Sequence, residues 1–166
     1  SLVITTTFWL LLAGTIMYYF NEYNNTLKDH GFWGKILVSV FNSATPRTAG
    51  FNNVDMTMLT TPTIMVTLFL MWVGASPGST GGGIKTTTFA VSVLNLFNQI
   101  KGRTRLVYNW REISIDSINQ VNAVILLSFI AIGTSTLLLS YFEPNMLFRN
   151  LLFEVVSAYS TVGLSL

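Results

Sequence analysis

The chain has 166 residues, of which 51% are hydrophobic and only 10% are charged. A soluble domain usually carries about a quarter charged residues, so these charges cannot cover a water-facing surface, and the composition predicts a membrane protein. The absence of cysteine excludes disulfides, thiol catalysis and cysteine-based metal sites. The net charge of +2 is too small to indicate nucleic-acid binding.

Residues 1–20 form an apolar run without charge or proline. About 20 apolar residues span the hydrocarbon core as a helix, and Tyr18, Tyr19 and Phe20 suit the membrane interface at its end. Since no charged region precedes the run, we expect a piece of a longer chain rather than a signal peptide. The polar residues 21–30, which include Glu22, are expected to form an aqueous loop.

A shorter apolar stretch at residues 32–43 is typical of a re-entrant or interfacial helix, because it cannot span a bilayer. The polar, glycine-containing residues 44–52 follow it. Residues 61–100 are predicted to form one spanning helix, interrupted at residues 75–85 where Pro77 and a run of glycines break the helical pattern.

Residues 101–116 hold the densest group of basic side chains, which are Lys101, Arg103, Arg105 and Arg111. Such an excess marks cytoplasmic loops, so residues 21–31 and 143–145 are expected on the outer side. A further spanning helix is predicted at residues 118–142. A break at Glu143-Pro144-Asn145 separates it from a short helix at 146–158 and a polar glycine segment at 159–165.

A long helix, a short helix and a polar glycine segment therefore occur twice in the same order. Thr48-Ala49-Gly50-Phe51-Asn52 matches Thr161-Val162-Gly163-Leu164-Ser165. Non-helical backbone at membrane depth is tolerated only where it is buried in protein or lines water. Glycine lets successive carbonyls turn toward one axis and replace the water shell of an ion, and the C-terminus of each short helix adds partial negative charge.

These features predict a path that is lined by oxygen atoms and that conducts a monovalent cation. The rival interpretation is a pair of ordinary polar hairpins outside the membrane. The expected filter residues, which supply backbone carbonyls and two hydroxyl groups, are Thr48, Ala49, Gly50, Phe51, Thr161, Val162, Gly163 and Leu164.

The glycine-rich residues 78–86 resemble a nucleotide-binding loop, but Ile84 stands between Gly83 and Lys85 where that motif requires lysine directly after glycine. We therefore expect no nucleotide here. A flexible break below the filter can gate the path, and the expected gate residues are Gly81, Gly82, Gly83 and Lys85. The alternative is a packing kink without a gating role.

Two basic side chains lie near these segments. Lys85 either repels cations in the path or pairs structurally, because a lysine at this depth needs a cavity or a partner. Arg47 is expected to point away from the path and to brace its segment by bonding carbonyls.

Three segments together carry a resemblance to a known family: Ala44-Thr45-Pro46-Arg47-Thr48-Ala49-Gly50-Phe51-Asn52, Gly78-Ser79-Thr80-Gly81-Gly82-Gly83-Ile84-Lys85-Thr86, and residues 153–165. In this order they strongly resemble the bacterial Trk/Ktr potassium-uptake membrane subunits, over essentially the whole chain. The resemblance implies an all-α membrane protein with four helix–pore loop–helix units of potassium-channel type around a pseudo-fourfold pore. Residues 1–100 then form the third unit and residues 117–166 an incomplete fourth.

The resemblance also implies a function, which is potassium uptake, with sodium as a second candidate ion. Potassium would be held at Thr48, Ala49, Gly50, Thr161, Val162 and Gly163. We expect neither enzymatic activity nor a covalent cofactor. The implied setting is lipid, as a multi-pass protein of the bacterial inner membrane, and the implied partners are a second copy of the pore and a cytosolic nucleotide-binding regulatory ring. The alternative function is a non-conducting membrane scaffold or assembly subunit.

Overall fold

The protein is helical, as predicted. A computed structural model describes residues 2–47, 49–102, 107–108 and 111–166. Its helices are α1 (Leu2–Glu22), α2 (Phe32–Ala44), the short 3-10 helix η1 (Met56–Met58), α3 (Thr61–Trp72), α4 (Thr86–Ile100), α5 (Ile115–Phe142) and α6 (Phe148–Tyr159). Two-residue strands, β1 (Val107–Tyr108) and β2 (Arg111–Glu112), pair antiparallel within the basic loop.

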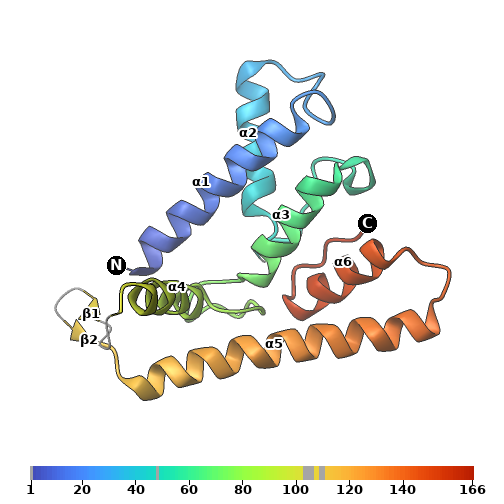
Figure 1. Ribbon diagram of the computed structural model, residues 1–166. Helices are drawn as coiled ribbons and strands as arrows, with labels where there is room; N and C mark the ends of the chain where they lie inside the picture. The colour runs from blue at the N-terminus through green and yellow to red at the C-terminus, as the bar shows by residue number, and fades with distance from the viewer. Residues whose placement is uncertain (1, 48, 103–106, 109–110) are drawn as a thin grey trace.

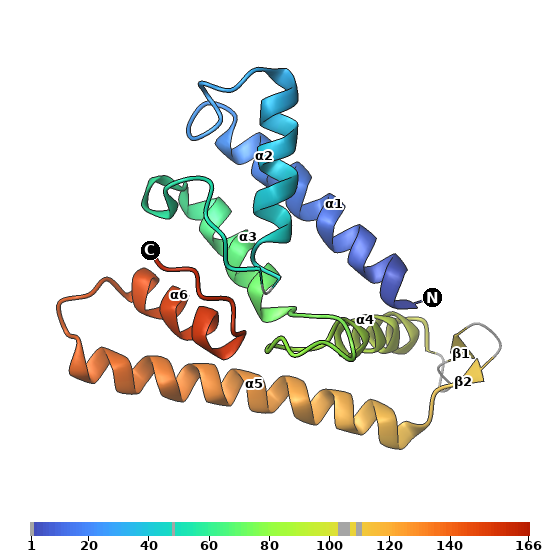
Figure 2. The same ribbon diagram turned by 180° about the vertical axis from the view of Figure 1, so that it is seen from behind.

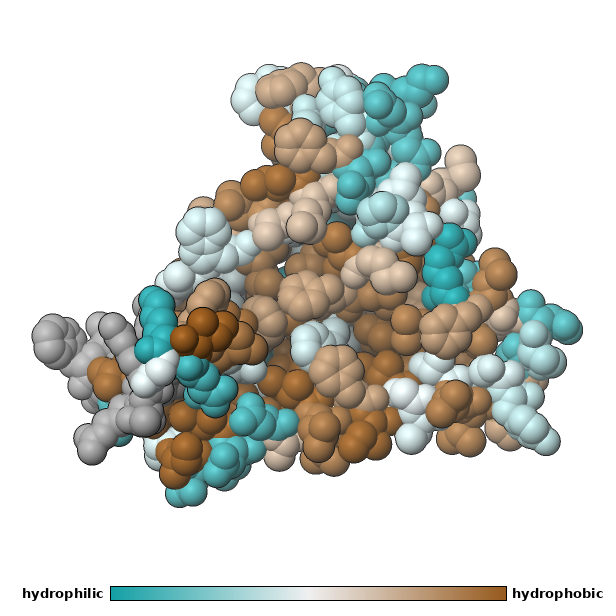
Figure 3. Space-filling view, viewed as in Figure 1, coloured by the Kyte–Doolittle hydropathy of each residue, from teal (hydrophilic) through white to brown (hydrophobic). Residues whose placement is uncertain are grey.

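Helices α1 and α5 are each long and apolar enough to cross a membrane. Only 17% of the most apolar window of each helix is buried, and their exposed side chains include Phe8, Leu127 and Leu137. Soluble proteins rarely leave so much contiguous apolar surface in water. Figure 3 shows hydrophobic side chains over the middle of one face, with hydrophilic ones gathered toward its edges.

Each short helix folds back on the long helix before it. Helix α2 returns along α1, and α6 returns along α5, as Figures 1 and 2 show. Gly14 lets α1 and α2 approach closely, because a Cβ there would collide with the Ser43 side chain. Ser43 Oγ also donates to Leu11 O at 2.9 Å. Small residues and hydroxyl bonds of this kind are typical of helix packing in membranes.

The predicted helix at 61–100 is two helices joined by a long loop. Helix α3 ends at Trp72 and α4 begins at Thr86, so the interruption covers residues 73–85 and is longer than predicted. Helix α4 then packs against α1 and α5 rather than extending α3. The end of α3 is fixed to α5, since Trp72 Nε1 donates to Ser128 Oγ at 3.1 Å.

The main core lies where the two halves of the chain meet. Helices α3 and α6 are in contact there. The buried side chains that they and the C-terminal residues contribute include Ile64, Leu68, Met71, Phe153, Val156, Val162 and Leu164. Val162 and Leu164 flank Gly163, so the second polar glycine segment is built into this core.

Candidate functional site

The two glycine corners lie next to each other. Gly50 has φ +69° and Gly163 has φ +83°, a left-handed conformation that glycine adopts without strain. A Cβ added at Gly50 would collide with the carbonyl oxygen of Val162. Two segments from distant parts of the sequence therefore meet backbone to backbone.

The last turn of each short helix holds the residue directly after the glycine. After α2, Thr45 Oγ1 donates to Phe51 O at 2.7 Å and accepts from Phe51 N at 3.0 Å. At the end of α6, Ser157 Oγ donates to Leu164 O at 2.6 Å. Since all of these atoms lie in loops or helix ends, the two hydroxyl groups fix the direction of the backbone as it leaves each corner.

A second brace in each half holds the third residue after the glycine. Asn42 Nδ2 of α2 donates to Asn53 Oδ1 at 2.9 Å, and Leu166 N donates to Glu154 Oε1 of α6 at 3.2 Å. We call these five hydrogen bonds the filter braces, after the filter that the sequence predicts; they are made by Thr45, Asn42, Ser157 and Glu154. The pattern repeats although the residue types differ, so the sequence repeat alone did not indicate it.

The two corners differ in burial. Phe51 is 70% exposed, whereas its counterpart Leu164 is 2% exposed in the core between α3 and α6. Ala49, Thr161 and Gly163 are exposed, and Val162 is buried. The predicted ligand Thr48 lies outside the described residues, so a hydroxyl group near the glycine is seen only in the second segment.

Thr161 adopts an uncommon backbone conformation. Its φ is +54°, which a β-branched residue reaches at a cost of about 1–2 kcal/mol. Backbone bonds from Thr161 N to Ala158 O at 3.1 Å and from Val162 N to Ser157 O at 3.0 Å hold the turn. The Thr161 hydroxyl accepts from Gly82 N at 2.7 Å, which connects the second segment to the glycine-rich loop.

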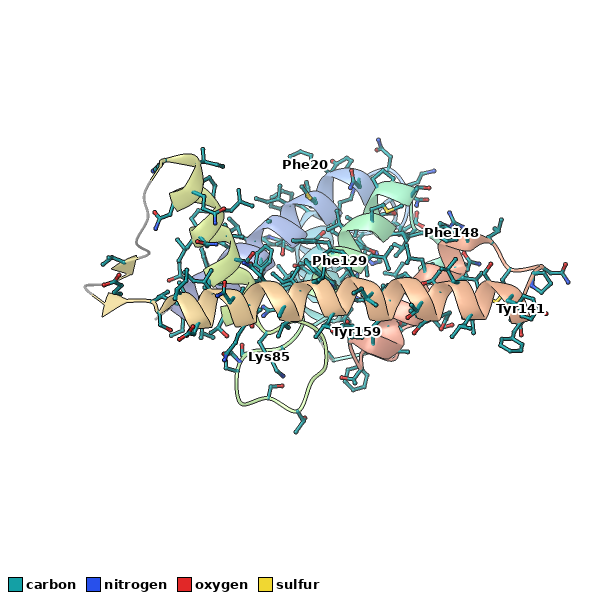
Figure 4. All side chains as sticks on the ribbon, turned by 60° about the horizontal axis from the view of Figure 1, so that its bottom comes forward. Phe20, Lys85, Phe129, Tyr141, Phe148 and Tyr159 are labelled. Atoms are coloured by element: carbon teal, nitrogen blue, oxygen red, sulfur yellow. The ribbon has the colours of Figure 1, made fainter. Side chains whose placement is uncertain are left out.

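The glycine-rich loop, residues 73–85, is anchored at both ends. Ile84 N donates to Trp72 O at 2.9 Å and Thr86 N to Ala75 O at 3.3 Å. Gly83 has φ +73°, and its backbone lies close to that of Trp72 and Gly74 at the other end of the loop. Residues 77–80 at the tip are exposed, and the loop projects beside α5 in Figure 4.

Lys85 closes this loop on itself. Its Nζ donates to Gly81 O at 2.6 Å and to Ser79 O at 3.1 Å, and Figure 4 shows Lys85 beside the loop. The side chain therefore pairs structurally, which is one of the two roles that the sequence left open. Its charge lies within the predicted gate.

Arg47 was expected to bond carbonyl groups, and its Nε makes no such bond within the part of the chain that the structure describes. Its Nε is buried and has no hydrogen-bond partner among the described residues. Arg47 lines a cavity of about 300 Å³ together with Thr7, Ala75 and Ser79. Arg47 therefore lies near both α1 and the glycine-rich loop.

Glu22 was expected in an aqueous loop, but it is the last residue of α1 and is fully buried. Its carboxylate accepts from Thr60 N and from the hydroxyl groups of Thr60 and Thr63 at 2.7–2.8 Å. Asn25 Nδ2 and the Thr26 hydroxyl also donate to it. The signal that could have indicated this was the cluster of threonines at the start of α3.

Among the described residues, no three His, Cys, Asp or Glu side chains gather closely enough to hold a metal ion. The oxygen atoms that the described residues of the two corners offer are those of the backbone and of the Thr161 hydroxyl group.

Comparison with known proteins places this arrangement in a family. The model of the TrkH family, described as a cation transport protein, matches residues 2–166. The chain is 36% identical over 158 residues to Ktr system potassium uptake protein B of Vibrio alginolyticus, covering 94% of this chain and 34% of that protein. It is 34% identical to Ktr system potassium uptake protein D of Bacillus subtilis, covering 95% of this chain and 35% of the relative.

The name of a third relative includes sodium as well as potassium. Potassium/sodium uptake protein NtpJ of Enterococcus hirae is 30% identical over 170 residues, covering 100% of this chain and 38% of that protein. The chain thus spans between a third and two fifths of the length of these curated relatives.

Proposed function

Since this chain belongs to the TrkH family of cation transport proteins, we propose that it forms part of a potassium-uptake protein whose selectivity filter has corners at Gly50 and Gly163. One observation carries this proposal: Gly50 lies against the Val162 carbonyl, although the two residues belong to different halves of the chain. The names of the relatives, which are potassium or potassium/sodium uptake proteins, support potassium as the main ion and sodium as a second one.

The chemistry of such a filter is the exchange of water for protein oxygen. Carbonyl groups replace the hydration shell of the ion, and binding must stay weak enough for the ion to leave. The C-termini of α2 and α6 both end at the glycine segments, so each adds partial negative charge there. The filter braces keep the backbone of each segment from collapsing away from the path.

We further propose that the two halves are pore units of one pseudo-fourfold ring. Residues 1–100 supply one complete unit, the third, and residues 117–166 most of the fourth. Support comes from the filter braces, which recur at the same two positions after each glycine. The remaining units would come from the rest of a longer chain.

The loop at residues 75–85 is the proposed gate of this path. Support comes from its contact with the second corner, where Gly82 N donates to Thr161 Oγ1. Gly81, Gly83 and Lys85 then shape the loop rather than bind the ion.

The proposed setting is the bacterial inner membrane, which the protein crosses several times. Two helices of sufficient length and the bacterial origin of the relatives support this. The proposed partners are a second copy of the pore and a cytosolic nucleotide-binding regulatory ring. The description of two relatives as components of a Ktr system supports a partner protein.

The test is to substitute alanine for Gly163 in the full-length protein. A Cβ at Gly163 meets open space, so only its φ of +83° is disturbed. Gly102 offers a matched control, because it has φ +66° with open space but lies after α4, away from the corners. Forcing alanine into this conformation costs about 1–2 kcal/mol, so the backbone at the corner should shift. If a loss of this size falls on rubidium binding alone, the preference for rubidium over sodium drops roughly tenfold.

The measurement is uptake of rubidium and sodium by cells that lack other potassium-uptake systems. We expect Gly163→Ala to reduce the preference for rubidium and Gly102→Ala to leave it unchanged. Gly50→Ala should have a larger effect, because its Cβ also collides with Val162 O. Unchanged uptake in both corner variants would contradict the filter and favour a non-conducting scaffold.

A further inference from the structure

The glycine-rich loop is pressed against the turn that begins the second filter segment. Gly82 N donates to Thr161 Oγ1 at 2.7 Å. A Cβ at Gly82 would lie 2.7 Å from Tyr159 O and 3.1 Å from Thr161 Cγ2. Real side chains do not tolerate such approaches to backbone, so the loop can dock here only through a glycine.

The docked part of the loop also carries a positive charge. Lys85 Nζ donates to the carbonyl groups of Ser79 and of Gly81, the residue directly before Gly82. Since the ends of the loop are anchored at Trp72 and Ala75, movement of the docked residues would carry the ammonium group with them. A docked loop therefore presents an amide hydrogen to Thr161, while the ammonium group bonds the opposite side of the same Gly81–Gly82 peptide and holds the shape of the loop.

The Thr161 hydroxyl oxygen can accept a hydrogen bond from the loop or bind a cation. It is exposed at the surface of the second segment, and a threonine hydroxyl has acceptor capacity for either partner. An amide hydrogen that points at this oxygen opposes a cation at the same place by charge, and the backbone of Gly82 fills the adjacent space. Occupancy by one partner thus disfavours the other.

We propose that Thr161 is the docking residue for the glycine-rich loop, and that a potassium ion at Thr161 and the docked loop exclude one another. This inference rests on the proposed function, because it needs an ion at the second corner. By linkage, potassium then favours the undocked loop by the same factor by which docking weakens potassium binding. The loop would open in response to its own substrate.

The experiment measures how accessible the tip of the loop is. A cysteine is placed at the exposed Thr80 in an otherwise cysteine-free full-length protein, and its rate of reaction with a water-soluble thiol reagent is followed. Potassium is exchanged for a large organic cation at constant ionic strength. We expect the Thr80→Cys protein to react roughly 2- to 10-fold faster in potassium, the factor that one hydrogen bond accounts for. As a control, a cysteine at the exposed Asp116 of α5 should react at the same rate in potassium and in the organic cation.

Two variants test the residue that the proposal names. Thr161→Val lacks the acceptor, so Thr80→Cys should react fast without potassium and gain nothing from it, whereas Thr161→Ser should restore the potassium dependence. If Thr161→Val is not produced, Gly82→Ala serves instead, because its Cβ displaces the loop from Tyr159 O. A rate that ignores potassium in the parent, or potassium dependence that persists in Thr161→Val, would overturn the proposal.

Rubidium uptake by Gly163→Ala separates this proposal from the proposed function. If Gly163→Ala changes uptake while the reactivity of Thr80→Cys ignores potassium, the filter stands and the docking role of Thr161 fails. If the corner variants leave uptake unchanged, the filter itself fails.

Discussion

Glu22 shows how one charged residue can organise the place where the end of α1 meets the start of α3. Its buried carboxylate accepts bonds from Thr60 and Thr63 at the start of α3, and from Asn25 beyond the end of α1. Asn25 in turn donates to Met58 O at 2.6 Å. The chain that follows the first filter segment is therefore tied to α1 through this carboxylate.

Replacing Glu22 with glutamine should destabilise the protein. The new amide group would present hydrogens toward the donors of Asn25 and Thr26, so polar groups in a buried place would lose their acceptor at a cost of about 1–3 kcal/mol. The measurement is thermal inactivation of the full-length protein in detergent. Glu143→Gln is the matched control, because Glu143 is exposed at the end of α5 and should shift stability by less than about 0.5 kcal/mol. Equal behaviour of the two variants would contradict the role of Glu22.

Thr45 tests the filter braces at a single residue. Thr45→Val keeps the shape of the side chain but leaves both Phe51 N and Phe51 O without their partner. A loss of about 1–3 kcal/mol is expected for such unpaired groups, and it should appear as a reduced preference for rubidium over sodium in uptake. Thr134→Val is the control, since its hydroxyl bonds only to carbonyls within α5. An unaltered preference in Thr45→Val would show that the brace does not shape the filter.

At the scale of elements, the sequence located the helices well. The short helix at 32–43 is α2 (Phe32–Ala44), and the long helices at 1–20 and 118–142 match α1 and α5 within a few residues, whereas the helix at 61–100 is divided into α3 and α4. Apolar runs and breaks at glycine or proline are local signals, so they can be read without a structure. The start of α5 was placed late because its first turn is polar; Ser114 Oγ caps it by accepting from Ser117 N at 3.3 Å.

Contacts between distant segments could not be predicted in this way. Nothing in the sequence indicated that Asn42 would meet Asn53, that Glu154 would hold Leu166 N, or that Gly82 would meet Thr161. These contacts depend on how α3 and α6 pack, which is a tertiary property. The matched glycine sequences belong to two segments that lie together, whereas the burial of Glu22 ran against local expectation. Arg47 Nε has no hydrogen-bond partner in the part of the chain that the structure describes.

The loop between α3 and α4 supplies a prediction for an element as a whole. Deleting Gly81 and Gly82 removes the residues that reach Thr161 and the carbonyl that Lys85 bonds, so the loop should no longer cover the path. We expect uptake at low external potassium to rise about tenfold, which corresponds to about 1.4 kcal/mol. Deleting Gly102 is the control outside the loop. If the deletion leaves the flux unaltered, the loop is a packing feature without a gating role.

For the whole molecule, the main question is how the two halves sit across the membrane. The core lies between α3 and α6, whereas α1 and α5 are largely exposed. Apolar surface of this extent needs lipid or further protein as its neighbour. The polar residues at 23–30 follow α1, and the basic residues at 101–111 precede α5, so the loops at these two places should mark opposite membrane surfaces.

This arrangement predicts which loops reach the cytoplasm. The excess of Lys and Arg at 101–111 places the start of α5 inside, and the path through α3, the glycine-rich loop and α4 then places residues 23–30 outside. A cysteine at the exposed Asp29 should therefore react with a membrane-impermeant reagent in intact cells expressing the full-length protein. A cysteine at the exposed Asp116 should react only after the cells are permeabilised. Labelling of both from the same side would mean that the α3–α4 segment does not cross the membrane, and a path between the two glycine corners would then have no inner end.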